Sequence, residues 1–243
     1  MTSQPRFAKL FIGFMALGGL LSLSYGLFQV HPLHSFRFLT LLVIALVASR
    51  LKLKLPGLNG NMSVNLPFIL IAVVELSLFE ALLIALASTG AQCFPKGGGW
   101  PQAVKMLFNV STMAVAVGLA GLIFQGRMPL PPAWVPGSLL LVLAGATFFL
   151  VQTLPVATII ALTEGGTMPR IWSSIVHLSF PYYVLSAGVA SIVTTASQHW
   201  GWQVPVLVLA VMYGVYRSYQ VYFGRPETSA RPSILAKAAA TSN

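Results

Sequence analysis

The sequence predicts an all-α polytopic membrane protein with six spanning helices and one re-entrant or broken helical segment, with seven spans as the alternative. Three observations predict this class. Of the 243 residues, 56% are hydrophobic and only 7% are charged. The apolar runs reach the length of about 18 residues that is typical of transmembrane helices. The Lys and Arg residues fall mainly on one side of such a topology.

Seven apolar segments follow one another, at about residues 8–29, 35–50, 67–92, 104–125, 135–163, 173–197 and 203–223. The first follows Arg6 and Lys9 and runs for about 20 residues, too long for a signal-peptide core, so we expect a retained helix. The connections are short and rich in Pro, Gly and Asn. We therefore expect one integral membrane domain over residues 1–225 and a short cytoplasmic tail, 226–243, that is too polar to fold alone.

Between the second and third segments, residues 51–55 read Leu-Lys-Leu-Lys-Leu, and this alternation predicts a short interfacial strand. Its lysines are suited to anionic lipid headgroups.

The third segment contains a break. Pro67 opens it, and Glu75 and Glu80 interrupt its apolar run. Two half-helices of this size are each too short to span, and non-helical backbone at depth requires surrounding protein or a wet cavity. The sequence predicts a re-entrant hairpin, with a continuous helix as the alternative.

The basic residues favour six crossings. If residues 67–92 do not cross, one side keeps only Arg37 and Arg127, and the other collects 12 of the 14 Lys and Arg residues (14 − 2). Cytoplasmic loops carry this excess, so we expect both termini to be cytoplasmic. The same rule accounts for the net charge of +10, and we expect no nucleic-acid partner.

The candidate ligand-binding residues are polar side chains inside apolar segments. An ionisable group in hydrocarbon is expensive, so Glu75 or Glu80 is expected to be protonated or paired within the protein. Asn109 and Gln152 can donate hydrogen bonds from adjacent spans and are the expected partners. The alternative for both amides is that they hydrogen-bond between packed helices.

Metal and catalytic signals are absent from the sequence. His31, His34 and His199 fall on the non-cytoplasmic side, but they have no neighbouring carboxylate or cysteine, so we expect no metal site and name no cofactor. Cys93 is expected to be an inert thiol. No HExxH, P-loop or GxSxG motif occurs, so we expect no enzyme.

The order of several motifs resembles a known family. They are Val64-Asn65-Leu66-Pro67-Phe68, Glu80-Ala81, Leu107-Phe108-Asn109, Gln152-Thr153, Leu162-Thr163-Glu164-Gly165, Pro181-Tyr182-Tyr183 and the run from Tyr216 to Arg225. This pattern resembles the multi-span sensory domain found N-terminal to bacterial HD-GYP and GGDEF proteins, which break or make cyclic di-GMP. Members often carry Gly-Pro at the break in the third segment, where this chain has Ser77-Leu78.

The resemblance implies a sensory or ligand-binding module in the bacterial cytoplasmic (inner) membrane. After Arg225 the sequence shows no output domain, so we expect it to act through a partner protein or larger assembly, with Arg217, Tyr219 and Arg225 as contacts. A homodimer stays open, because small residues recur at four-residue spacing. The alternatives are an accessory structural subunit of a respiratory or photosynthetic complex, and the substrate-binding membrane component of a small-molecule transporter.

Overall fold

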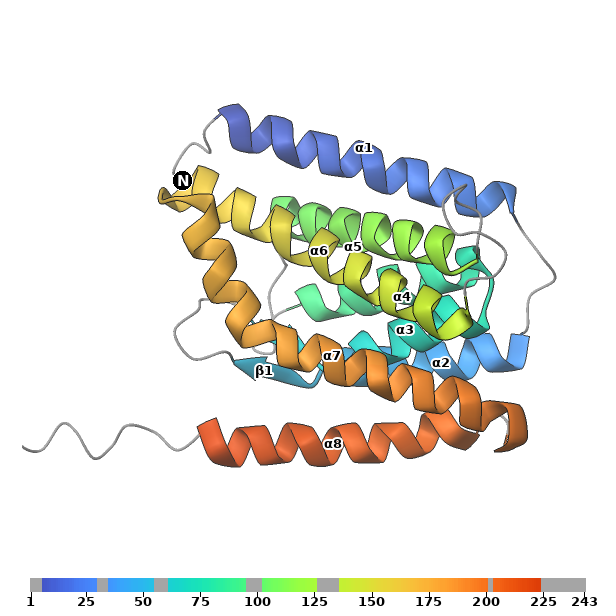
Figure 1. Ribbon diagram of the computed structural model, residues 1–243. Coiled ribbons are helices and arrows are strands. Elements are labelled where there is room, and N and C mark those ends of the chain that lie inside the picture. The colour runs from blue at the N-terminus through green and yellow to red at the C-terminus, as the bar shows by residue number, and fades with distance from the viewer. Residues whose placement is uncertain are drawn as a thin grey trace, which may run out of the picture.

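The structure is a computed structural model that describes residues 6–29, 35–54, 61–94, 102–125, 136–200 and 203–223. Its elements, in chain order, are α1 (Arg6–Phe28), α2 (Ser35–Ser49), β1 (Lys52–Lys54), β2 (Asn61–Ser63), α3 (Leu66–Glu75), α4 (Leu78–Cys93), α5 (Ala103–Phe124), α6 (Gly137–Glu164), α7 (Met168–Trp200) and α8 (Gln203–Phe223). Figure 1 shows a bundle with α1 along one side and α8 along the opposite side.

The long helices alternate in direction, and α3 and α4 together form a hairpin that returns to the end where it starts (Figure 1). As a result α1 begins and α8 finishes at the same end of the bundle. We call this the basic end, because every described Lys and Arg except Arg37 lies toward it; they are Arg6, Lys9, Arg50, Lys52, Lys54, Lys105, Arg170 and Arg217. We call the opposite end, where α2 begins with Arg37, the far end.

Four of the described helices are long and apolar enough to cross a membrane, namely α1, α5, α6 and α7. The shorter apolar helices are α2, α3 and α4. The class predicted from the sequence, a multi-helix membrane domain with a broken third segment, is therefore confirmed.

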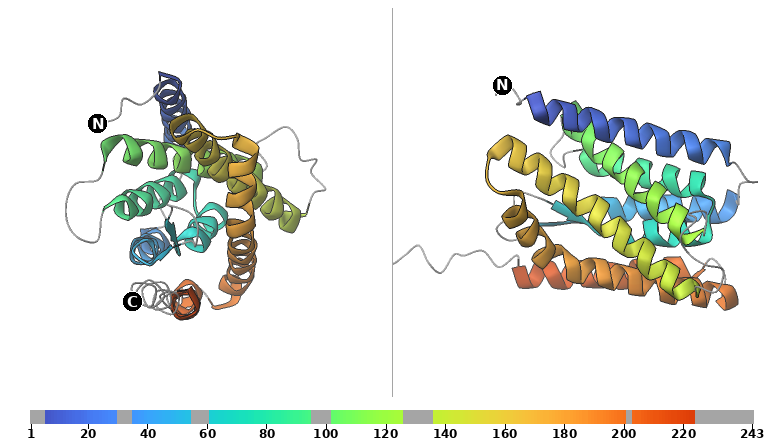
Figure 2. Two further views of the ribbon diagram at one scale, coloured as in Figure 1. Left: turned by 90° about the vertical axis from the view of Figure 1, so that its left-hand side faces the viewer. Right: turned by 45° about the horizontal axis from the view of Figure 1, so that its top comes forward.

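The central helix is α3, and it is buried on all its sides. Every residue from Leu66 to Val73 is buried. In the end view of Figure 2, α3 lies among α2, α4, α5 and α7. A helix that is apolar all round is stable only when it is fully surrounded, and the neighbouring helices meet that requirement here.

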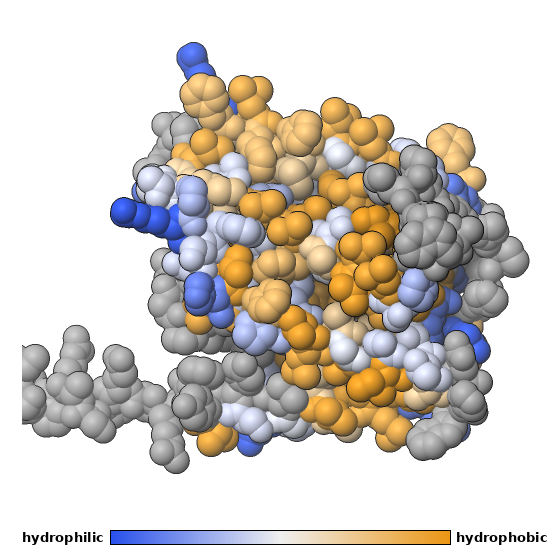
Figure 3. Space-filling view, in the orientation of Figure 1, coloured by the Kyte–Doolittle hydropathy of each residue, from blue (hydrophilic) through white to orange (hydrophobic). Residues whose placement is uncertain are grey.

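The outer helix α1 has the opposite arrangement. Its buried face carries mostly small residues, including Ala8, Gly19 and Gly26, while large side chains such as Phe14 and Leu20 are exposed. Figure 3 shows this apolar surface along α1 and parts of α6 and α7. Small residues inside and large apolar residues outside are typical of a helix that packs closely on its neighbours and faces lipid.

A short β-hairpin leads into the α3–α4 hairpin. β1 pairs antiparallel with β2, with Lys52 opposite Ser63 and Leu53 opposite Met62. The strand predicted from the alternating Leu and Lys residues is thus confirmed at Lys52–Lys54. It lies at the basic end, beside α8 (Figure 1).

Candidate functional site

The turn between α3 and α4 is built by a capping box. The Ser77 hydroxyl accepts a hydrogen bond from the Glu80 backbone N–H (3.3 Å) and donates one to Glu80 Oε2 (2.7 Å), which also accepts from the Ser77 N–H (3.0 Å). This reciprocal pairing satisfies N–H groups that the first turn of a helix leaves without intrahelical partners. Glu80 is 0% exposed, so its carboxylate is held entirely by protein.

The backbone needs neither glycine nor proline to turn here. Leu76 and Ser77 both adopt extended conformations, at φ −115° and φ −64°, which ordinary residues reach without strain. The predicted break is therefore confirmed, at Leu76-Ser77, and the Ser77 side chain caps the second half. The two halves are 10 and 16 residues long.

Two hydrogen bonds join α3 to α7, one at each end of α3. At its start, the Leu66 backbone N–H donates to the Tyr182 hydroxyl, so a free first-turn donor finds an acceptor. At its finish, the Ser197 hydroxyl donates to Glu75 Oε1. The sequence predicts a pairing inside the protein for Glu75 or Glu80, and the structure shows one for each: Glu75 with Ser197 and Glu80 with Ser77.

The open end of the hairpin is also fixed. The Asn65 amide donates to the Ser88 hydroxyl at 3.2 Å, linking the start of α3 to the later part of α4, and both side chains are buried. Arg50, at the basic end, donates to the Ala91 carbonyl at 3.0 Å. These contacts show that the hairpin starts and finishes beside the same end of α2.

The tip of the hairpin lies near the far end of the bundle. A Cβ at Gly26 would meet Leu82 at 2.8 Å, and one at Gly121 would meet Leu78 at 2.6 Å. Gly26 and Gly121 lie in the last turns of α1 and α5. The hairpin therefore runs almost the length of the bundle before it turns.

The structure does not bring Asn109 and Gln152 to the glutamates. The Asn109 amide lies against Cys93 Sγ at 3.8 Å, and the Gln152 amide lies against Met113 Sδ at 3.4 Å. The expectation that these two amides donate to Glu75 and Glu80 is wrong, because α5 and α6 present them well away from the hairpin tip. Their contacts are instead between neighbouring helices, the alternative that the sequence left open.

Within the described residues, no group of three or more His, Cys, Asp and Glu side chains is suited to a metal ion. His31, His34 and Arg225 lie outside the described residues, as do the side chains of His199 and Tyr219. Arg217 is exposed on α8.

Sequence reasoning missed the residues that hold the hairpin. The Ser77-Leu78-Phe79-Glu80 run is the S-x-x-E signature of a capping box, so it could have been found. Ser197 and Tyr182 gave no such signal, because their partners lie more than a hundred residues away in the chain.

Together, the apolar bundle, its lipid-type outer face and the buried hairpin define a multi-span, membrane-associated helical domain. The chain matches the MASE9 family model over residues 10–222 and belongs to that family. MASE domains are membrane-associated sensory domains and not a catalytic family, which confirms the resemblance noted in the sequence. No curated protein and no solved structure matches the chain.

Proposed function

We propose that this protein is a non-catalytic sensory module of the bacterial cytoplasmic membrane, with six crossings, a re-entrant α3–α4 hairpin and both termini in the cytoplasm. The concentration of Lys and Arg at the basic end supports the orientation, because positive residues mark the cytoplasmic side. The contacts of Asn65 and Arg50 support a hairpin that returns to that side.

The observation that carries the sensory role is the double hydrogen bonding of α3 to α7. The pairs Leu66–Tyr182 and Glu75–Ser197 fix both ends of a central helix to one outer helix. A displacement of the hairpin must then either break one of these bonds or move α7. A change in the position of the buried hairpin therefore changes the position of α7, which begins at the cytoplasmic side.

The partner contacts α8 near its cytoplasmic end. Arg217 is exposed there, and the predicted contact Tyr219 follows within α8. The predicted contact Arg225 comes after the described residues of α8 in the sequence. α8 packs on α7, so a shift of α7 changes the surface that the partner meets.

Cysteine labelling tests the orientation. In a Cys93→Ser background, Gly60→Cys and Gly99→Cys flank the hairpin, and Gln29→Cys marks the far end. We expect an impermeant thiol reagent to label positions 60 and 99 from one side and position 29 from the other. Labelling of positions 60 and 99 from opposite sides would mean that residues 67–92 cross the membrane.

Site-specific photo-crosslinking in native membranes tests the relay. A photoreactive amino acid at Arg217 should give one defined protein adduct, whose yield changes when Ser197→Ala removes the hairpin-to-α7 bond. The same probe at Phe14, on the lipid-type face of α1, is the matched control. An adduct insensitive to Ser197→Ala argues against the relay, and substrate uptake by the purified chain in liposomes would favour the transporter instead.

A further inference from the structure

One exposed face of α7 changes from polar to apolar along the helix. Its first part carries Arg170, Ser173, Ser174 and His177, at the spacing of residues that share a helix face. The same face continues with large apolar side chains, which are Phe180 (51% exposed), Val184 (54%), Leu185 (44%) and Ile192 (71%). We call these the polar half and the apolar half of the stripe.

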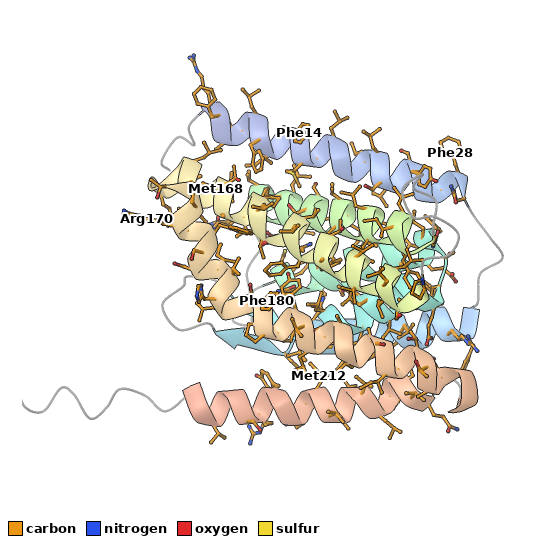
Figure 4. All side chains as sticks on the ribbon, in the orientation of Figure 1. Phe14, Phe28, Met168, Arg170, Phe180 and Met212 are labelled. Atoms are coloured by element: carbon orange, nitrogen blue, oxygen red, sulfur yellow. The ribbon has the colours of Figure 1, made fainter. Side chains whose placement is uncertain are left out.

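The change in polarity coincides with a change in direction. α7 contains Pro181, and Figure 1 shows the helix crossing the basic end of the bundle before it turns to run along it. Proline inside a helix removes one backbone hydrogen bond and causes such bends. In Figure 4, Arg170 lies at the basic end of the molecule and Phe180 lies farther along α7, toward the apolar surface.

The length of the apolar half matches one leaflet. From Phe180 to Ile192 the helix rises about 18 Å at about 1.5 Å per residue. Half of a hydrocarbon core of about 30 Å is about 15 Å. A lipid whose acyl chains lie on the apolar half therefore has its headgroup at the level of Arg170 to His177.

We propose that the polar half binds the phosphate of an anionic phospholipid, so that one lipid molecule lies along the whole stripe. The Arg170 guanidinium offers a planar fork of donors that matches two phosphate oxygens. The Ser173 hydroxyl lies one turn along the same face. His177 Nδ1 lies 3.0 Å from the Ser173 carbonyl, which can only accept, so this nitrogen carries the proton. Nε2 of the neutral ring is then an acceptor, suited to a hydroxyl of the headgroup and not to its phosphate oxygens.

Electrostatics favour an anionic headgroup over a zwitterionic one. Among the described residues, Glu164 is the only acid toward the basic end, whereas eight Lys and Arg residues lie there, as named above. Each basic residue near an anionic surface adds to this attraction. The acyl chains of a lipid would contact the apolar half, whereas a soluble phosphate or an acidic peptide would not. The apolar half therefore favours a lipid as the ligand. Lipid binding along the stripe does not depend on a relay to a partner.

The test measures phosphatidylglycerol binding to the purified full chain by native mass spectrometry, with phosphatidylcholine as the reference lipid. We expect Arg170→Gln to weaken phosphatidylglycerol binding about tenfold, because it removes charge-assisted hydrogen bonds. Arg170→Lys should weaken it about threefold, since it keeps the charge and loses the fork. Lys105→Gln, at the same end, and Arg37→Gln, at the far end, should each change phosphatidylglycerol binding less than twofold, because each alters only the general surface charge.

Several results would overturn the proposal. Equal losses in Arg170→Gln and Lys105→Gln would mean that general surface charge attracts the lipid. Equal binding of the two lipids would exclude recognition of the anionic headgroup. Competition by inorganic phosphate as effective as by phosphatidylglycerol would identify a soluble anion as the ligand. Arg170, Lys105 and Arg37 are all exposed, so all of these variants are expected to fold. Their elution in size-exclusion chromatography checks this.

Discussion

α1 and α3 are both strongly apolar helices, yet they use their apolar residues in opposite ways. In α3, all eight positions from Leu66 to Val73 are buried by protein. In α1, only every third or fourth position is buried, and Phe7, Phe14 and Phe28 are 70–90% exposed.

Hydropathy therefore does not distinguish the interior of a membrane protein from its lipid-facing surface. What distinguishes them is the size of the residues at helix contacts and the hydrogen bonds at helix termini. α1 contacts α5 through glycines, whereas α3 is held at both ends by polar side chains from distant parts of the chain. Substitutions should therefore have large effects in the hairpin and small effects on the outer face of α1.

The largest effect is expected for Glu80→Lys. The ammonium would be buried beside the Ser77 N–H and hydroxyl, which both donate to the carboxylate in the native protein. The free energy of unfolding should fall by at least about 5 kcal/mol, because the helix loses its cap and a buried charge is left uncompensated. Glu80→Gln keeps an oxygen that accepts from Ser77 and should retain folded protein, at a loss within about 2 kcal/mol. Thermal unfolding in detergent checks this, and equal stability of the two variants would contradict a buried cap.

The next largest effect is expected for Phe68→Ala in α3. Phe68 is 0% exposed, and its removal leaves a cavity that should lower the free energy of unfolding by about 3–5 kcal/mol. Phe14→Ala in α1 is the matched variant; its side chain is 70% exposed, and the loss should stay within about 0.5 kcal/mol. Denaturant unfolding in mixed micelles measures both. Similar losses would mean that the outer face of α1 is covered by protein.

A smaller effect is expected for Gly19→Ala in α1. Its Cβ would meet the Ser111 backbone at 3.0 Å to Cα and 3.2 Å to the carbonyl oxygen, so α1 and α5 must separate, at a loss of about 1–3 kcal/mol. Gly13→Ala, in the same helix, has nothing within 4 Å and should gain up to about 1 kcal/mol from helix propensity. Opposite signs of the two changes in stability would confirm close packing; a loss in both would point to a contact around Gly13.

The smallest effect on stability is expected for Ser197→Ala, about 0.5–1.5 kcal/mol from one hydrogen bond to Glu75. Ser218→Ala in α8 is the control, since its hydroxyl bonds only within its own helix, to the Gly214 carbonyl at 3.0 Å. Hydrogen exchange of the last turn of α3 provides a local measurement. Unchanged exchange in Ser197→Ala would show that this bond does not hold the helix.

Much of the fold could be predicted from the sequence, because it follows from apolar run length and local turn chemistry. The seven segments coincide with helices, and the alternating Leu and Lys residues with β1. The interruption at Glu75 and Glu80 marked the break, since two carboxylates in an apolar run disfavour an unbroken lipid-facing helix.

The partners within the candidate site could not be predicted in the same way. Asn109 and Gln152 were predicted to donate to Glu75 and Glu80, because amides within membrane spans need hydrogen-bond partners. In the structure their amides lie instead against the sulfur atoms of Cys93 and Met113. Which side chains meet depends on the rotation of each helix about its own axis. Small residues such as Gly19 and Gly118 determine that rotation only through contacts that the sequence does not show.

The proline in α7 also determines where water reaches the backbone. Pro181 has no N–H, so the carbonyl of His177 loses its intrahelical donor. That carbonyl lies where the exposed face changes from polar to apolar, and at this depth headgroup water can hydrate it. The same proline three turns farther along α7 would leave a bare carbonyl in hydrocarbon, where an unsatisfied backbone group costs several kcal/mol. α7 therefore bends at a position where water can satisfy the carbonyl that the proline leaves without a donor.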